Sequence, residues 1–250
     1  QRNPAPVRLR KQRREDKLAS LKPMKMAIVT DAWEPQANGV VTTMRNTRAC
    51  AEKSGHEVFM VTPDKFRSMP CPFYKEIRLS LKPYNKVARL LDTFEPDCIH
   101  VATEGPLGYA AGRYCEKNGL PFTSSLHTRF PEYVRLRVPI PLDVSYGYMR
   151  HFHSKAANTL VRTKTQKTEL EARGFKNLKV WPGAVDTSLF KPRGKNALSL
   201  PRPISMYMGR LTREEGLESF LDLDLPGTQV VIGDGPARAD EHVDPRGSDR

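Results

Sequence analysis

Polar side chains that could do chemistry follow several of the apolar, β-branched runs in the sequence. His127 is the most distinctive of them, because it comes directly after such a run in the segment LHTRFPEY. A neutral imidazole at the end of a buried strand can donate a hydrogen bond into a cleft. A lone histidine is also common as a satisfied part of a core, so both interpretations stay open.

Two carboxylates occupy the same kind of position. Glu104 lies in the segment ATEGPLG, and Glu132 lies in the segment that contains His127. Two carboxylates could serve as the acid and the base of a glycosidase, but that chemistry depends on the distance between them. The sequence does not give this distance, and a glycosidase remains an alternative.

Asn38 and Gly39 end the segment DAWEPQANG, directly before an expected helix. The free N–H groups and the dipole of a helix N-terminus suit a phosphate, although Asn-Gly is also an ordinary turn dipeptide. The pattern G-x-G-x-x-G is absent, and Gly105, Gly108 and Gly112 have a different spacing. A nicotinamide-dependent enzyme is therefore disfavoured.

The segments that must position these side chains alternate between strand and helix. Short β-branched runs predict strands, and apolar residues at helical spacing predict helices, several of which end at a glycine. The expected strands are 26–30, 56–61, 97–101, 121–125, 159–161 and 178–181. The expected helices are 40–53, 86–94, 107–118, 143–156 and 164–173, with an irregular proline-rich stretch over 62–83. This alternation predicts a parallel, doubly wound α/β sheet, in which ligands bind at the carboxyl ends of the strands.

Composition divides the chain into four regions. Residues 1–23 are expected to form a basic flexible leader, 24–195 a complete Rossmann-like domain, 196–236 an incomplete second domain and 237–250 a disordered tail. The second domain is expected to be cut short, because it holds only the strands 204–208 and 229–232 and the helix 214–223.

The formal net charge is +13, and residues 24–211 account for all of it, because the basic leader and the acidic end of the chain cancel each other. A basic body favours polyanionic partners, which could be nucleic acid, an anionic lipid surface or a phosphorylated small molecule. The 4 cysteines are far apart and form no C-x-x-C pair, which argues against a zinc site or a disulfide framework. No apolar run is long enough to cross a membrane.

Five segments, in this order, resemble one known family: AIVTDAWEPQANGVVTT, HVATEGPLG, FTSSLHTRFPEY, VWPGAVDTSLFKP and MGRLTREEGLESFLDLDLPGTQVVIGDGP. They resemble the retaining glycosyltransferases of family four, above all the bacterial nucleotide-sugar-dependent α-mannosyltransferases and the sulfoquinovosyl-type lipid glycosyltransferases. The resemblance spans 24–236. It implies an α/β fold of the GT-B class, with a complete N-terminal Rossmann-like domain and the start of a second one.

The resemblance also implies roles for individual residues. His127 would face the donor sugar and Arg210 would bind the diphosphate, as the two catalytic residues. The implied donor-binding residues are Asn38, Gly39, Gly209, Arg210, Glu215, Gly233 and Gly235. The implied acceptor-side residues are Glu104, Arg129, Glu132 and Tyr133. No metal and no cofactor are implied, since GDP-mannose or a UDP-sugar would be the donor substrate.

This sequence departs from the family at three places. A lysine usually follows the diphosphate-binding arginine by five positions, and Glu215 stands there instead. Gly183-Ala184 replaces the usual Arg-Gly, and the chain ends before the acidic motif that holds the donor ribose and sugar. Because attraction at Glu215 is replaced by repulsion, donor binding could lose several kcal/mol, so this chain is expected to be weakly active or inactive.

The expected function is the transfer of a hexose, mannose in first place, to a lipid-linked or glycan hydroxyl with retention of configuration. A non-catalytic remnant that binds anionic membrane surfaces is the alternative. No nucleic-acid partner is expected, because the sequence has no zinc-finger, RNA-recognition or basic-zipper signature. The expected location is the cytoplasm, with peripheral contact at the inner face of the membrane.

Overall fold

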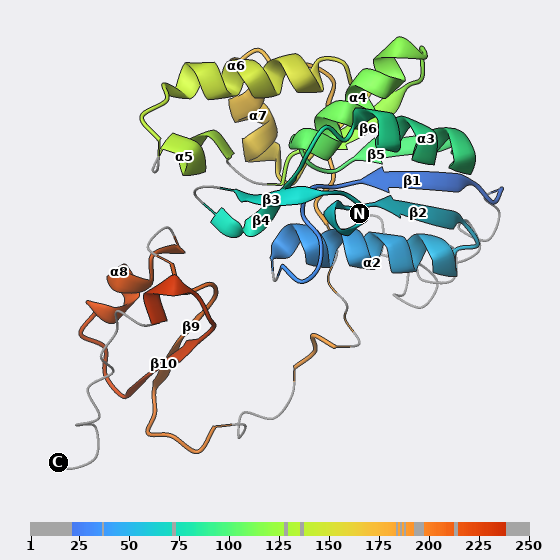
Figure 1. The fold of residues 1–250 in the computed structure, drawn as a ribbon. Helices are drawn as coiled ribbons and strands as arrows, with labels where there is room; N and C mark the ends of the chain where they lie inside the picture. Colours follow the sequence, from blue (N-terminus) through green and yellow to red (C-terminus); the bar gives the residue numbers. More distant parts are fainter. Residues whose placement is uncertain are drawn as a thin grey trace, which may run out of the picture. The chain divides into compact units, whose positions relative to one another are not determined.

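A computed structural model of the chain describes residues 22–36, 38–71, 74–127, 130–135, 138–183, 185, 187, 189–192, 198–212 and 215–238. The chain separates into two compact units, one within residues 1–184 and one within residues 185–250 (Figure 1). The domain boundary expected near residue 195 falls among residues 193–197, outside the described residues.

A six-stranded parallel sheet forms the centre of the first unit, with the strand order β2-β1-β5-β6-β7-β8. Its strands are β1 (Lys25–Val29), β2 (Glu57–Val61), β5 (Cys98–Val101), β6 (Phe122–Ser125), β7 (Asn158–Val161) and β8 (Leu178–Val180). All six predicted strands of this region are therefore present. Their carboxyl ends lie along one edge of the sheet because the strands are parallel.

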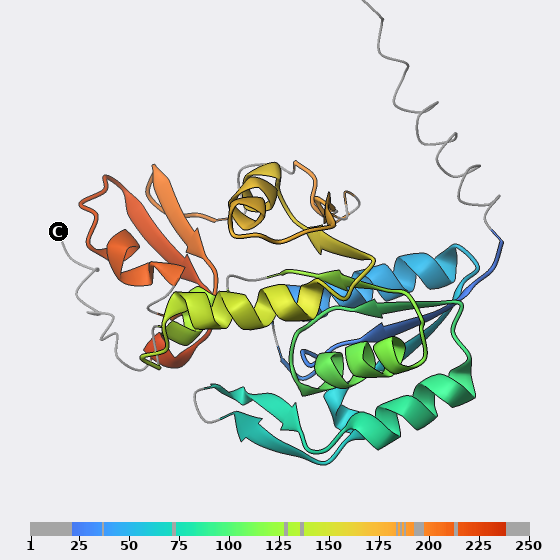
Figure 2. The ribbon, with the colours of Figure 1, turned by 90° about the horizontal axis from the view of Figure 1, so that it is seen from above.

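Helices cover both faces of this sheet (Figures 1 and 2). They are α2 (Gly39–Lys53), α3 (Tyr84–Phe94), α4 (Pro106–Lys117), α5 (Phe130–Arg135), α6 (Leu142–His153) and α7 (Lys164–Ala172). Ile28 of β1 packs in a cluster with Val40 and Met44 of α2. Its neighbours Ala27 and Val29 point to the other face and pack in a cluster that includes residues of α3 and α4. The alternation of side chains along β1 thus holds helices on both sides.

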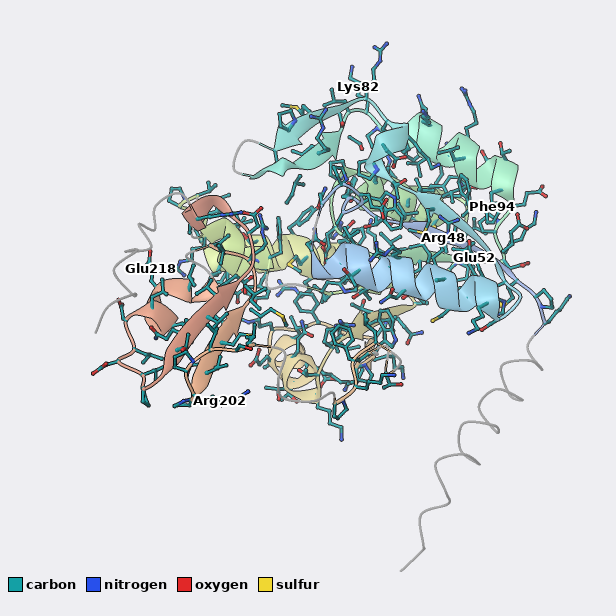
Figure 3. The ribbon with its side chains drawn as sticks, turned by 90° about the horizontal axis from the view of Figure 1, so that it is seen from below. Arg48, Glu52, Lys82, Phe94, Arg202 and Glu218 are labelled. Carbon is teal, nitrogen blue, oxygen red and sulfur yellow. The ribbon has the colours of Figure 1, made fainter. Side chains whose placement is uncertain are left out.

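Local sequence explains where α2 begins and how its outer face is stabilised. The side-chain oxygen of Asn38 accepts hydrogen bonds from the N–H groups of Val40 and Val41, both at 3.0 Å. This cap satisfies two of the N–H groups that a helix start leaves without a partner. On the exposed face, Arg48 Nε lies 2.8 Å from Glu52 Oε1, one helical turn away (Figure 3).

The stretch over 62–83 was expected to be irregular, and this prediction was wrong. Residues 68–80 form an antiparallel pair of strands, β3 (Ser68–Cys71) and β4 (Tyr74–Ser80), after a short 3₁₀ turn at Pro63–Lys65. Pro70 lies inside β3, opposite Arg78, and the register shifts directly after it. A proline is tolerated here because each strand of a two-stranded sheet has an edge that needs no hydrogen-bond donor.

The second unit is small. It contains β9 (Ile204–Met208), α8 (Leu217–Leu221), β10 (Thr228–Ile232) and a 3₁₀ turn at Pro236–Arg238, and β9 pairs with β10 in parallel. The helix is shorter than the expected 214–223, because Gly216, at its start, has a left-handed backbone with φ of 75°. Large apolar side chains remain exposed, with Met208 at 75%, Met206 at 46% and Ile232 at 45%.

Backbone amides of β9 and β10 are expected to exchange with solvent at least about 100-fold faster than those of β1, β5 and β6, since each has only one strand partner and little apolar cover. Hydrogen exchange followed by mass spectrometry measures this difference on the intact chain. Equal protection in both units would show that the two-stranded sheet is as stable as the six-stranded one.

Candidate functional site

The candidate site in the first unit is built at the carboxyl ends of β1, β6, β7 and β8. Asp31, His127, Arg162 and Trp181 each follow one of these strands directly or by two residues. In parallel α/β sheets this edge is where ligands bind. Among the four, only His127 was identified from the sequence.

Asp31 is buried at the end of β1 and anchors the start of α4. Its carboxylate accepts hydrogen bonds from Thr103 Oγ1 at 2.9 Å, from Leu107 N at 2.8 Å and from Gly108 N at 3.2 Å. Burial is the largest effect on this group and raises the pKa of Asp31 to about 6 despite these three donors. Asp31 therefore ties the segment after β5 to the end of β1, and an acid directly after an apolar strand was the signal for it.

His127 lies at the end of β6 as an uncharged donor and acceptor. Its Nε2 is 2.7 Å from Ser125 Oγ, and its ring meets the ring of Trp181 edge-on at 6.4 Å. Burial, followed by the positive charge of Arg162, lowers the pKa of His127 to about 4, although the carboxylate of Glu104 acts in the opposite direction. His127 is therefore neutral at neutral pH and can form hydrogen bonds without a charge.

Arg162 is the functional candidate that the sequence reasoning missed. It follows β7, and its guanidinium lies 5.8 Å from the ring centre of Trp181. Within the described residues, its Nη1 is a buried nitrogen that has no hydrogen-bond partner. A cation with an unused donor can stabilise an anion. A basic residue directly after a strand, at the ligand-binding edge, was the signal that could have found it.

The two carboxylates proposed for the acceptor side are both held by side chains of α6. Glu104 Oε1 lies 2.9 Å from His153 Nε2, and the main-chain oxygen of Glu104 accepts from Tyr148 Oη at 2.8 Å. Glu132 Oε1 accepts from Tyr146 Oη at 2.6 Å. Each carboxylate thus has a structural partner before any ligand is considered. Arg129 and the side chain of Tyr133 lie outside the described residues.

The predicted phosphate position at the start of α2 is partly occupied by the protein itself, because Asn38 caps two of the free N–H groups. Gly39 is different. A Cβ built on Gly39 would meet nothing within 4 Å, so packing does not require a glycine there. The role of Gly39 at a donor phosphate stays a prediction.

In the second unit, the candidate glycines pack two loops together. A Cβ on Gly233 would lie 1.8 Å from Gly209 O, and one on Gly235 would lie 2.4 Å from Leu211 O. Tyr207 Oη donates to Arg210 O at 2.9 Å and lies 3.5 Å from Glu215 O. The backbones of Arg210 and Glu215 therefore meet at one hydroxyl, and the Glu215 carboxylate adds to burial in raising the pKa of Tyr207.

The described part of the chain holds no group of three or more His, Cys, Asp or Glu side chains that could bind a metal. In the same residues, no helix is both long enough and apolar enough to span a bilayer.

The stability of the first unit should depend on pH through three buried groups. His100 and His127 have pKa values of about 4 instead of 6.5, so the unfolded chain binds protons that the folded chain refuses as the pH falls. Asp31, at about 6 instead of 3.8, has the opposite effect. Because two groups oppose one, the free energy of unfolding is expected to fall by about 1.4 kcal/mol for each pH unit as the pH is lowered from 6 to 4.

Urea unfolding followed by tryptophan fluorescence measures this slope, because both tryptophans of the chain, Trp33 and Trp181, lie in the first unit. The substitution His127→Gln should make the stability nearly independent of pH in this window. A slope that is the same in this variant and in the original chain would contradict the assignment to His127.

A family model described as Glycosyltransferase Family 4 matches residues 37–189. The chain is 26% identical to a GDP-mannose-dependent α-mannosyltransferase of Mycobacterium tuberculosis, over 86% of this chain and 64% of that protein. It is 31% identical to an α-monoglucosyldiacylglycerol synthase of Acholeplasma laidlawii, over 85% of this chain and 64% of that protein. It is 28% identical to the sulfoquinovosyl transferase of Arabidopsis thaliana, over 81% of this chain and 45% of that protein.

The chain therefore spans less than two thirds of the length of these relatives. Among solved structures, an α-glucosyltransferase in complex with UDP-glucose and DNA aligns with a TM-score of 0.52 at 15% identity, over 86% of this chain and 58% of that one. This likeness concerns the fold alone, and it confirms the predicted α/β fold of the GT-B class.

Proposed function

Because the chain belongs to Glycosyltransferase Family 4, we propose that it transfers a hexose from a nucleotide diphosphate sugar to a lipid-linked or glycan hydroxyl, with retention at the anomeric carbon. Mannose from GDP-mannose is the first candidate, since the match to a GDP-mannose-dependent mannosyltransferase covers 64% of that protein. Glucose from a UDP-sugar is the second, because a glucosyltransferase relative matches over a similar length.

The main support for this proposal is that the family match over residues 37–189 includes the carboxyl ends of β2, β5, β6, β7 and β8, with His127 and Arg162. Within it, His127 is neutral and can bind a sugar hydroxyl without gaining or losing charge. Arg162 offers positive charge beside it. Hydroxyl binding and charge stabilisation are the two tasks that a sugar-nucleotide site requires.

The chemistry needs no resident cofactor in this proposal. When the bond between the sugar and the diphosphate breaks, negative charge grows on the diphosphate, and fixed cations stabilise it. Arg162 is the candidate for this role in the first unit, and the resemblance separately assigns the role to Arg210. His127 orients the sugar, because an uncharged imidazole cannot neutralise the leaving group.

Lipid acceptors and peripheral membrane contact fit the surface of α5 and α6. Phe130, Val144 and Tyr148 are exposed there, and the chain carries a net charge of +13. Exposed apolar side chains on a basic protein suit an anionic membrane surface at the cytoplasmic face. The absence of a nucleic-acid partner stays a prediction.

Sugar transfer from radiolabelled GDP-mannose or UDP-glucose tests the proposal directly. We expect slow formation of a labelled lipid with vesicles that contain diacylglycerol and an anionic phospholipid, followed over hours because Glu215 is expected to slow turnover. The variant His127→Ala is the control, since it removes the sugar contact and leaves the fold-building Asp31 intact. No product above this control with either donor would contradict the proposed function.

A further inference from the structure

A continuous row of hydrogen bonds links His127 to a second histidine deep in the sheet. His100, in the middle of β5, has Nδ1 at 2.9 Å from Thr123 Oγ1 and Nε2 at 3.2 Å from Ser125 Oγ. The same Ser125 hydroxyl lies 2.7 Å from His127 Nε2. The strand register makes this possible, because His100 pairs with Thr123 across the β5–β6 ladder.

The number of protons available limits how this row can be arranged. Each hydroxyl can donate once, and each neutral imidazole carries one N–H and one acceptor nitrogen. Burial lowers the pKa of His100 to about 4, so both rings are neutral at neutral pH. The tautomer of one histidine is therefore coupled to the tautomer of the other through Ser125.

The contact lengths favour one direction of hydrogen-bond donation along this row. In this forward direction, each group donates toward His127. An O–H donor usually forms the shorter hydrogen bond, near 2.7 to 2.8 Å, and an N–H donor the longer one, near 2.9 to 3.0 Å. The 2.7 Å contact fits Ser125 donating to His127, and the 3.2 Å contact fits His100 Nε2 donating to Ser125. Thr123 then donates to His100 Nδ1.

In the reverse direction, in which each group donates away from His127, the hydrogen bonds donated by the two hydroxyls are longer. If His127 Nε2 donated to Ser125, the hydroxyls would be left with longer alternatives. Ser125 would donate over 3.2 Å to His100 or 3.5 Å to Ala102 O, and Thr123 over 3.5 Å to Ile99 O. In the forward direction, from Thr123 to His127, the two hydroxyls donate over 2.9 and 2.7 Å instead.

We propose that His100 is a positioning residue that, through Ser125, holds the proton of His127 on Nδ1 and so makes His127 a hydrogen-bond donor toward an oxygen of the bound sugar. The identity of this ligand rests on the proposed function, whereas the tautomer does not. In the described part of the chain, Nδ1 of His127 has no protein partner, and it is not among the buried polar atoms that lack one. It is therefore accessible to a ligand.

The tautomer can be observed directly by NMR of the intact chain labelled with ¹⁵N-histidine, through the long-range couplings between ring nitrogens and ring protons. At pH 7, His127 is expected to carry its proton on Nδ1. In His100→Phe, a ring of similar size has no nitrogen to donate to Ser125, and His127 is expected to become a mixture of both tautomers. Unchanged His127 signals would overturn the proposal.

Two further variants keep the test decisive if His100→Phe does not fold. Thr123→Val has nearly the same shape but removes the donor to His100 Nδ1, so a change at His127 is again expected. Ser124→Ala is the matched control, because Ser124 Oγ serves His153 Nδ1 at 2.8 Å and does not belong to this row. A change at His127 in Ser124→Ala that equals the change in Thr123→Val would also overturn the proposal.

Ligand binding separates this inference from the proposed function. His100→Phe is expected to weaken binding of the sugar nucleotide about tenfold and to leave binding of the free nucleoside diphosphate unchanged, as the loss of one hydrogen bond predicts. If the tautomer changes as expected but no sugar nucleotide binds, the proposed function fails and the role of His100 stands. If the sugar nucleotide binds but the tautomer does not change, the role of His100 fails alone.

Discussion

Replacing Gly108 by alanine is expected to lower the free energy of unfolding of the first unit by about 3 kcal/mol, at the upper end for an added methyl group in a packed site. A Cβ at this position would lie 1.8 Å from Thr103 O and 3.0 Å from Val101 Cγ1. The nearest atom belongs to the backbone, so no side-chain rotation can relieve the clash. Thr103 cannot move away without losing its hydrogen bond to Asp31.

Gly147→Ala provides the matched control, since it adds the same methyl group to another helix. A Cβ on Gly147, inside α6, would meet nothing within 4 Å. Alanine there should raise stability by about 0.5 to 1 kcal/mol because it is the better helix former. Urea unfolding of both variants, followed by tryptophan fluorescence, should give effects of opposite sign. A Gly108→Ala variant as stable as the original chain would mean that the first turn of α4 is not packed tightly against Thr103.

Replacing Glu215 by lysine is expected to tighten binding of a nucleoside diphosphate at least about tenfold, because repulsion becomes attraction and about 1.4 kcal/mol suffices for this factor. The main-chain oxygens of Arg210 and Glu215 both lie at the hydroxyl of Tyr207, and the resemblance assigns both residues to the diphosphate. Arg210→Ala should weaken the same binding, since water does not replace a bidentate guanidinium contact.

Asp222→Lys is the control for net charge in this experiment, because it also changes the charge by two units within the second unit. Asp222 lies at the C-terminal end of α8, where a lysine is favourable for the helix. Calorimetric titration of GDP and UDP should show a gain in Glu215→Lys and little change in Asp222→Lys. Equal gains would mean that general attraction explains the effect, and the role assigned to Arg210 and Glu215 would have to be withdrawn.

The sequence predicts the strands of this protein well because their signal is local. Ile204–Met208 is a strand with the predicted bounds, and the six strands of the first unit are found where β-branched runs occur. The pair β3–β4 was missed for the opposite reason, since its stability comes from pairing between residues whose own sequence is rich in proline. Local propensity does not report such a partner.

The candidate site was less predictable, because it depends on contacts between distant residues. His127 could be found as a polar side chain after a strand. Arg162 follows a strand in the same way, but its proximity to Trp181 depends on β7 and β8 being neighbours in the sheet. The row from Thr123 to His127 requires the register of β5 and β6, which no single segment contains.

The glycines after β5 show which information their spacing contains and which it does not. The spacing of Gly105, Gly108 and Gly112 does not match the G-x-G-x-x-G pattern. Their actual task is close packing, because a Cβ on Gly105 would lie 2.4 Å from Asp31 Cγ. Asp31 is far away in the sequence, so this role could not be derived from spacing alone.

Titration of GDP-mannose, UDP-glucose, GDP and UDP into the chain and into His127→Ala measures whether the first unit contributes His127 to a sugar-nucleotide site. At least one sugar nucleotide should bind saturably to the original chain. His127→Ala should weaken that binding about tenfold while binding of the matching nucleoside diphosphate stays unchanged, because only the sugar contact is lost. No saturable binding of either sugar nucleotide, or an equal loss of affinity for the sugar nucleotide and its nucleoside diphosphate, would contradict this role of His127.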